Sequence, residues 1–278
     1  MNIDPVIKWT GSKRNQADAI ISYFPKDIDA YYEPFLGGGS IAIRLMNSPD
    51  HKVKHYILSD INSDLFSLWN EIKHNPAKLM DEYNARWCAL NMDEDMQRKK
   101  DYYYGIRERF NLNRDPADFL FLSRTATSGL IRFNSKNEFN SSFHFGRPGI
   151  DPVRLRKITD FWSSCLNKNN VTISQASFTE IDNLTKNDFL YCDPPYAVTK
   201  AIYNGGLNLD EFFQWLRDMP CKYAFSFDGK KDGVAVWDNV PKDLYARHLY
   251  LAGGKGRFTG SSTDRSVVVE ESLYLSYN

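Results

Sequence analysis

The residues best suited to chemistry in this chain are Asp193, Pro194 and Tyr196, which follow directly on the apolar run 189–192. A short apolar run bounded by turn residues predicts a buried strand, and two successive prolines end it because neither can donate to a ladder. The strand end then presents a carboxylate, a free carbonyl and an aromatic ring. Two acceptors without a donor suit an exocyclic amino group, and Tyr196 can stack on the flat ring that carries it. An ordinary Asp-Pro turn is the alternative interpretation.

A second group of residues is typical of a nucleoside-binding site. The segment 30–46 predicts a strand, a turn with three glycines at 37–39, an N-capping Ser40 and a helix. The next predicted strand ends at Asp60, 21 residues after Gly39, and this spacing suits an acid that accepts from ribose hydroxyls. Neither the Gly-x-Gly-x-x-Gly pattern nor a phosphate loop is present, so a nucleoside-type cofactor is favoured over a pyrophosphate.

Trp9 and Lys13 lie on either side of Gly11 near the start of the chain. A turn at this glycine can present an indole and an ammonium group to one ligand, with the indole covering an aromatic or cationic group and the ammonium group meeting a carboxylate. A buried tryptophan and a solvated lysine are the alternative interpretation.

Length and composition are those of a soluble globular protein with one large α/β domain, or one domain plus a smaller one. The 278 residues include 35 basic and 35 acidic side chains and 42% hydrophobic residues. No apolar run approaches a membrane span, and residues 1–5 lack the features of a signal peptide, so we expect no membrane association. The cysteines are scattered without a metal-type pair, which favours reduced thiols in the cytoplasm and no metal site. They are Cys88, Cys165, Cys192 and Cys221.

The predicted alternation of strands and helices is interrupted between Asn75 and Lys157, which indicates an inserted domain. Helical, charged stretches run to Phe110, and a polar, glycine-bearing section follows from about Phe119. Within that section, residues 128–140 predict a hairpin with its turn near Lys136–Asn137. The sheet is expected to resume with strands at 171–174, 189–192, 223–227 and 266–274, and the glycine-rich segment 253–265 predicts a mobile loop.

Basic side chains concentrate between positions 124 and 157, although the formal net charge of the chain is zero. This stretch holds seven basic residues and two acidic ones, Glu138 and Asp151. A neutral protein with one basic face can still bind a phosphate backbone, and the hairpin carries polar side chains that can read base edges. A solvated basic loop is the alternative. The basic residues are Arg124, Arg132, Lys136, Arg147, Arg154, Arg156 and Lys157.

Four motifs, taken together and in order, resemble the Dam-like class of DNA adenine methyltransferases. They are Lys8-Trp9-(x)3-Lys13, Glu33-Pro34-Phe35-(x)-Gly37-(x)-Gly39-Ser40, Ser59-Asp60-Ile61-Asn62 and Asp193-Pro194-Pro195-Tyr196. The segments Gly129-Leu130-(x)-Arg132-(x)-Asn134, Glu138-Phe139-Asn140 and 265–273 are also similar to that class. The resemblance covers nearly the whole chain.

The resemblance implies a Rossmann-like methyltransferase sheet in an α/β catalytic domain (residues 1–74 and 158–278). It also implies a mostly helical, hairpin-containing target-recognition insert (residues 75–157). Asp193, Pro194 and Tyr196 would be catalytic. The residues implied for S-adenosylmethionine are Trp9, Lys13, Glu33, Phe35, Gly37, Gly39, Ser40, Asp60, Phe178 and Asp193. Those implied for double-stranded DNA are Arg124, Ser128, Leu130, Arg132, Asn134, Asn140 and Ser142.

The implied reaction is methyl transfer to the N6 amine of an adenine flipped out of the duplex, which needs neither a metal nor a covalent nucleophile. Such a protein would act in the cytoplasm of a bacterium or of a virus's host, in restriction–modification or as an orphan methylase, as a monomer or weak dimer on DNA. Members that methylate GATC carry Tyr-Asn at Thr127-Ser128 and Pro at Ser142, so the recognition sequence stays open. Methylation of cytosine or RNA and non-catalytic nucleic-acid binding are the alternative functions.

Overall fold

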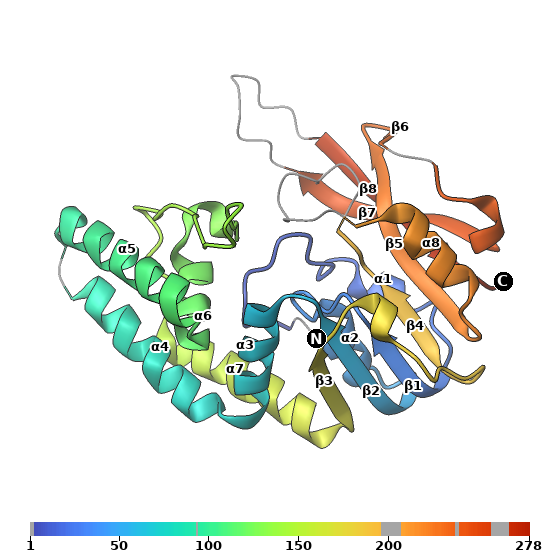
Figure 1. Cartoon of the computed structure of the whole chain (residues 1–278), viewed down its shortest axis with the longest axis horizontal. Coiled ribbons are helices and arrows are strands. Elements are labelled where there is room, and N and C mark those ends of the chain that lie inside the picture. The colour runs from blue at the N-terminus through green and yellow to red at the C-terminus, as the bar shows by residue number, and fades with distance from the viewer. Residues whose placement is uncertain (1–2, 93, 196–206, 237–238, 257–266) are drawn as a thin grey trace.

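A mostly parallel sheet lies on one side of the molecule, and a group of helices lies beside it (Figure 1). The computed structural model describes residues 3–92, 94–195, 207–236, 239–256 and 267–278. The strand order is β3-β2-β1-β4-β5-β8-β7, with β6 paired to β5. The strands are β1 (Asp27–Glu33), β2 (Lys52–Asp60), β3 (Val171–Gln175), β4 (Phe189–Cys192), β5 (Lys222–Lys231), β6 (Val234–Ala235), β7 (Arg247–Gly256) and β8 (Val267–Leu275).

The chain order reverses between β1 and β4, which pair in parallel at the centre of the sheet. From β1 the chain proceeds to β2 and β3 on one side, whereas β4 leads to β5 on the other. All four residues of β4 are buried, as expected for a strand covered on both faces. Crevices at such a reversal, outside the carboxyl ends of the strands, are where α/β proteins bind ligands.

Helices cover both faces of the sheet and build two apolar clusters. The larger cluster includes residues of α1, α2, α3 and the helical insert, and the smaller one is centred on Phe212 and Leu216 of α8 against Leu190 and Phe225. The helices are α1 (Ala17–Ile21), α2 (Ser40–Met46), α3 (Ser63–His74), α4 (Pro76–Asn91), α5 (Met96–Asn113), α6 (Pro116–Thr125), α7 (Pro152–Lys168) and α8 (Leu209–Arg217). Single 3-10 turns lie at Thr127–Gly129, Phe178–Glu180 and Lys242–Leu244.

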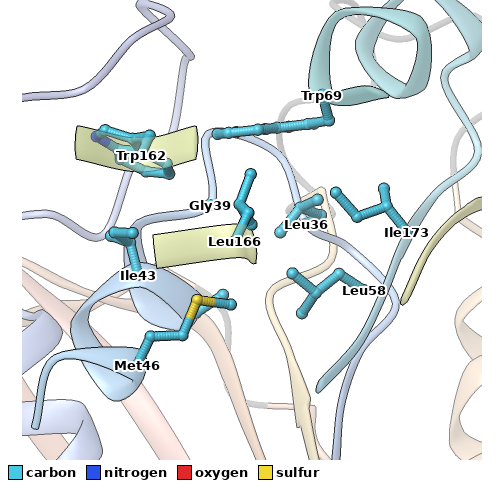
Figure 2. A pocket seen from close by; sticks show the side chains of 10 residues that line it. Leu36, Gly39, Ile43, Met46, Leu58, Trp69, Trp162, Leu166 and Ile173 are labelled. Carbon is cyan, nitrogen blue, oxygen red and sulfur yellow. The ribbon is translucent and has the colours of Figure 1, made fainter. Parts of the chain in front are cut away.

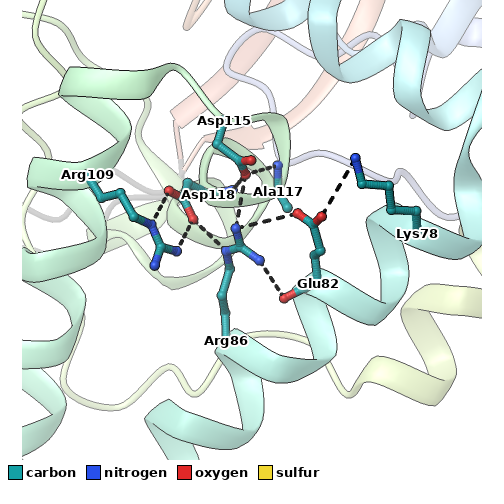
Figure 3. Close-up of polar contacts among 7 residues, drawn as sticks. All are labelled: Lys78, Glu82, Arg86, Arg109, Asp115, Ala117 and Asp118. Carbon is teal, nitrogen blue, oxygen red and sulfur yellow. Dashed lines mark hydrogen bonds and ion pairs between the residues drawn. The ribbon is translucent and has the colours of Figure 1, made fainter.

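A buried carboxylate joins the helices of the insert (Figure 3). Asp118 of α6 is fully buried and pairs with Arg86 of α4 and Arg109 of α5, whose Nε lies 2.8 Å from Asp118 Oδ2. Arg86 also contacts Asp115, which accepts from the first backbone N–H groups of α6. One side chain therefore links three helices of the insert.

The predicted hairpin of the insert is confirmed in its pairing and its turn. Phe133 pairs with Phe139 in an antiparallel bridge, and Ala126 pairs with Phe143 further along. The chain reverses at residues 134–137, where Asn137 has φ +59°. The two arms form isolated bridges rather than continuous strands, because Asn134 and Ser141 side chains take over several of the backbone bonds.

Two expectations from the sequence need correction. The polar section does not begin at Phe119, because α6 extends to Thr125 and buries almost every residue between. The first part of the expected mobile loop is strand, since β7 continues to Gly256, and residues 257–265 lie outside the described residues. The insert boundary at Lys157 stays a prediction; that residue lies within α7, a helix that contacts both α4 and α3.

Candidate functional site

Asp193 lies directly after β4, at the sheet edge where the parallel strands end. Its Oδ1 is 2.8 Å from Nζ of Lys13, and the same Nζ is 3.1 Å from Oε2 of Glu271 on β8. The Lys13 side chain is 2% exposed, whereas the carboxylate side chains keep 19% and 22%. An approaching ligand therefore meets the two acids of this ion cluster before it meets the lysine, and the alternative of a solvated Lys13 is wrong.

In the ion cluster of Lys13, Asp193 and Glu271, burial and the opposite charge of a partner shift the pKa values of Lys13 and Asp193 in opposite directions. Burial raises the pKa of Asp193 to about 6, although Lys13 opposes this and Glu271 adds to it. Burial disfavours the charge on Lys13, but the two carboxylates outweigh it, so the pKa of Lys13 is raised. At neutral pH the cluster keeps a net negative charge that suits a cationic ligand or a hydrogen-bond donor.

The glycine turn after β1 lies against Trp9 and Asp60. Gly37 has φ +49°, and a Cβ there would lie 2.9 Å from Nε1 of Trp9, so the indole packs on the bare backbone of the turn. The backbone N–H of Gly37 donates to Asp60 Oδ2 at 2.9 Å, and that of Asn62 donates to Oδ1 at 3.0 Å. Burial raises the pKa of Asp60 to about 6. The structure thus brings together the turn and the acid that the sequence spacing pairs.

Ser40 does not cap α2, contrary to the sequence-based expectation. Gly39 occupies the N-cap position in a left-handed conformation, and Ser40 is the first helical residue, with its hydroxyl 2.8 Å from that of Ser12. The prediction is wrong because Gly39 already turns the chain into the helix, which leaves the Ser40 hydroxyl to fasten the N-terminal turn to α2.

The side chains that line the pocket beneath the glycine turn are apolar (Figure 2). Trp69 and Trp162 lie with ring centroids 5.1 Å apart, and the Trp69 indole N–H donates to the Gly37 carbonyl at 3.0 Å. Leu58, Leu166 and the rest of the lining offer no polar group for a nucleoside. This pocket is therefore part of the packing that supports the turn.

Glu33, at the end of β1, is buried and accepts from the Tyr31 hydroxyl at 2.7 Å. Burial raises its pKa to about 8, with the Tyr31 bond opposing this and Asp193 contributing to it. Glu33 therefore holds a proton at neutral pH unless a cation approaches. Nearby, Phe35 stacks on Phe178 at 5.6 Å, so these two expected cofactor residues contact each other.

The expected catalytic residues are only partly within the structure. Pro194 is buried beside Asp193, while Tyr196 lies outside the described residues. Glu271 is the site residue that the sequence analysis did not single out. A signal was present, because two successive acids follow an apolar run, and in a strand one of two neighbouring side chains must face inward.

The expected DNA-contacting residues differ in exposure and in the contacts that they make. Arg132, Asn140 and Ser142 are exposed, and Leu130 is half-buried. The Asn134 side chain instead shapes the hairpin turn, since its Oδ1 accepts from two backbone N–H groups of residues 136 and 138. For Ser128 the structure describes only the backbone, which is part of a 3-10 turn.

Arg124 is engaged inside the protein. Its Nε donates to the Val6 carbonyl at 2.9 Å, its Nη2 contacts the Pro5 and Val6 carbonyls, and burial lowers its pKa to about 10. A contact from Arg124 to DNA would have to replace these bonds. Two further basic residues of the stretch, Arg154 and Arg156, pair with acids of the chain.

Within the described ranges, no group of three His, Cys, Asp or Glu side chains is arranged to hold a metal ion. Over those same residues, none of the helices combines the length and the apolar character needed to cross a membrane. The site presents hydrogen-bond acceptors and carboxylates near a glycine turn. Such groups can bind a cationic ligand that carries hydroxyl groups, and they can orient an amine.

Comparison with known proteins places this site in a family context. Residues 9–254 match the family described as D12 class N6 adenine-specific DNA methyltransferase. The chain is 32% identical over 212 residues to the type II methyltransferase M.MjaIII of Methanocaldococcus jannaschii, covering 70% of each. It is 34% identical over 198 residues to a DNA adenine methylase of Haemophilus influenzae, covering 69% of this chain and 64% of that protein.

Other similarities are more distant. The modification methylase StsI of Streptococcus sanguinis is 29% identical over 98% of this chain, which spans 42% of that protein. Among solved structures, the rRNA methyltransferase aviRa of Streptomyces viridochromogenes aligns with a TM-score of 0.41 at 10% identity, over 99% of this chain and 86% of that one.

Proposed function

The chain belongs to the family of D12 class N6 adenine-specific DNA methyltransferases, and from this membership we propose that it methylates the N6 amine of adenine in double-stranded DNA, with S-adenosylmethionine as methyl donor. The observation that carries the proposal is Asp193, a carboxylate at the end of β4 beside the glycine turn. Acceptors next to a nucleoside-type site are what a reaction on an amino group requires.

The residues around the glycine turn fit S-adenosylmethionine chemically. That molecule carries a sulfonium and an ammonium group together with ribose hydroxyls, so it needs acceptors and negative charge. Asp60 supplies a half-buried carboxylate at the turn, Glu33 can release its proton to solvent when a cation binds beside it, and Lys13 is covered. We propose that Trp9, Phe35, Phe178 and Gly39 complete the cofactor site with these residues, together with Ser40 and Lys13.

The proposed mechanism uses acceptors that are fixed before the substrate arrives. When bound, S-adenosylmethionine supplies an electrophilic methyl group. Lys13 contacts Oδ1 of Asp193, so Oδ2 can accept from the flipped N6 amine, and the Pro194 carbonyl can accept the second N–H. Both bonds draw the nitrogen lone pair away from the ring and stabilise the positive charge that develops on nitrogen. Tyr196 is proposed to stack on the flipped base.

A labelling experiment tests the proposal directly. The purified chain is incubated with methyl-labelled S-adenosylmethionine and unmethylated duplex DNA, and the DNA is digested to nucleosides. We expect the label in N6-methyldeoxyadenosine, and sequencing of the modified DNA would give the recognition site. Label in N4-methyldeoxycytidine, or only in added RNA, would overturn the adenine assignment. DNA binding without any transfer would identify a non-catalytic protein.

Asp60→Ala should weaken cofactor binding. Its carboxylate is proposed to accept from the ribose hydroxyls, and loss of charge-assisted hydrogen bonds costs about 1.5–3 kcal/mol, so we expect the Kd to rise by about ten- to a hundredfold. Isothermal titration calorimetry measures this. Asp27→Ala, at the exposed start of β1, is the matched control. An unchanged cofactor affinity in Asp60→Ala would remove that role.

We propose that the helical segment 75–157 reads the DNA, through Ser128, Leu130, Arg132, Asn140 and Ser142. Arg132, Asn140 and Ser142 are exposed on the hairpin segment, which suits direct contacts. Asn134 and Arg124 would then support the interface from within, by shaping the turn and by holding the N-terminal segment. We further propose cytoplasmic action as a monomer or weak dimer on DNA, as part of restriction–modification or as an orphan methylase.

Arg132→Ala should relax sequence choice at one base pair of the recognition site. A guanidinium bonded bidentately to guanine contributes about 1–3 kcal/mol of discrimination, or roughly five- to more than a hundredfold. The measurement is methylation of a panel of duplexes with single-base changes. Lys136→Ala, at the exposed turn of the same hairpin, is the control. A uniform loss over the whole panel would assign Arg132 to the phosphate backbone instead.

A further inference from the structure

Glu271 enters the site from the antiparallel part of the sheet. It lies on β8 between Asp228 of β5 and Leu251 of β7. Both neighbouring strands are irregular here, and a Cβ at Gly229 of β5 would lie 2.3 Å from the Glu270 carbonyl oxygen. The tight bulge at Gly229 therefore fixes the backbone of β8 where Glu271 points to Lys13.

We propose that Glu271 is a positioning residue for methyl transfer, acting through Lys13; this rests on the proposed function. By holding the lysine Nζ at 3.1 Å, Glu271 keeps it on one oxygen of Asp193 and leaves the other to accept from the target amine. Glu271 itself need not touch the substrate.

The geometry explains why a second carboxylate is needed. A buried ammonium group cannot find water, so it draws as close as possible to whatever acceptors it has. Lys13 also donates to the Gly11 carbonyl at a long 3.3 Å. With Glu271 present, the lysine is shared between two acids. Without it, Lys13 would move onto Asp193 alone and compete with the amine for both oxygens.

The charges around Asp193 predict how Glu271 changes the pKa of Asp193. Lys13 favours the ionised form of Asp193, and Glu271 opposes it. Removing the charge of Glu271 should therefore lower the pKa of Asp193 and extend activity to lower pH, whereas a purely structural defect would lower the rate at every pH. The other titratable groups facing this region are Glu33 on β1, Tyr191 and Cys192 on β4, and Asp228 on β5.

The test compares Glu271→Gln, Glu271→Asp and the control Glu270→Gln on the opposite face of β8. For Glu271→Gln we expect kcat at pH 8 to fall at least about tenfold, as misplacement of a reacting group does. With cofactor at saturation, the KM for DNA should stay within about twofold, and the acid limb of the kcat profile should move to lower pH. Glu271→Asp keeps the charge and should keep the acid limb, with a smaller loss of kcat. Glu270→Gln should behave as wild type.

A double-mutant cycle with Lys13→Gln tests the route of action. If Glu271 acts through the lysine, Glu271→Gln should cost less than about twofold once Lys13 is gone. Additive losses, an unmoved acid limb in Glu271→Gln, or kcat within twofold of wild type would each overturn the proposal. If Glu271→Gln does not fold, Glu271→Asp decides: a moved acid limb or unchanged kcat overturns it. A wild-type chain that forms no N6-methyladenine would instead overturn the proposed function.

Discussion

Asp193→Ala is expected to lower the rate of methyl transfer at least about a hundredfold, the cost of removing one preorganised contact to a developing charge. The variant loses the acceptor that is proposed to draw the nitrogen lone pair out of the adenine ring. Its fold should survive, because Lys13 keeps Glu271 as a partner at 3.1 Å. The measurement is the single-turnover rate with saturating cofactor and DNA, with thermal unfolding recorded on the same samples.

Two further variants sharpen this comparison. Asp182→Ala removes an exposed acid ahead of β4 and should leave the rate unchanged. Asp193→Asn keeps one acceptor oxygen and should lose less activity than Asp193→Ala. Turnover of Asp193→Ala within about tenfold of wild type would show that the reacting amine is oriented by other groups.

Asp118→Ala should destabilise the protein by on the order of 3–5 kcal/mol, as removal of one member of a buried ion pair does. Asp118 is fully buried between Arg86, which is 12% exposed, and Arg109. Without it, both guanidinium groups lose their shared partner, and Arg86 stays covered by the helices. Urea unfolding of the purified variant measures the change in the free energy of unfolding.

Asp101→Ala, on the exposed face of α5, is the control for Asp118→Ala. A loss below about 1 kcal/mol would mean that Asp115 and Glu82 compensate fully for Asp118. Cofactor affinity, measured where the variant is still folded, should stay close to wild type, because the network does not touch the glycine turn.

The centre of the site could be predicted from the sequence because its signals are local. An apolar run stopped by two prolines places Asp193 at a strand end, and Asp60 follows the glycine turn at a spacing set by one helix and one strand. Both patterns depend on backbone rules that hold in any parallel sheet. The hairpin turn at Lys136–Asn137 could be predicted equally well, since turn residues mark it.

The remaining features depend on contacts between distant parts of the chain. Glu271 meets Lys13 only because β8 inserts antiparallel beside β5, and no spacing encodes that pairing. Arg124 looked like a member of a basic surface, but it binds carbonyls 118 residues away. The predictions of a polar section from Phe119 and of a loop from Gly253 were wrong, because packing and strand pairing override local propensity.

The continuity of α7 limits how the proposed DNA-reading insert can be exchanged between two proteins of this family. Its first half contacts α4, where Thr159 lies 3.1 Å from the sulfur of Met80, and its second half brings Trp162 and Leu166 beneath the glycine turn. A chimera that exchanges residues 75–157 would join two proteins in the middle of this helix. One that exchanges only 127–149 would join them in irregular backbone outside α6 and α7. Exchange of the hairpin segment therefore leaves both helices uncut, although Gly129 packs against Lys8 beside the N-terminal turn and has to be kept.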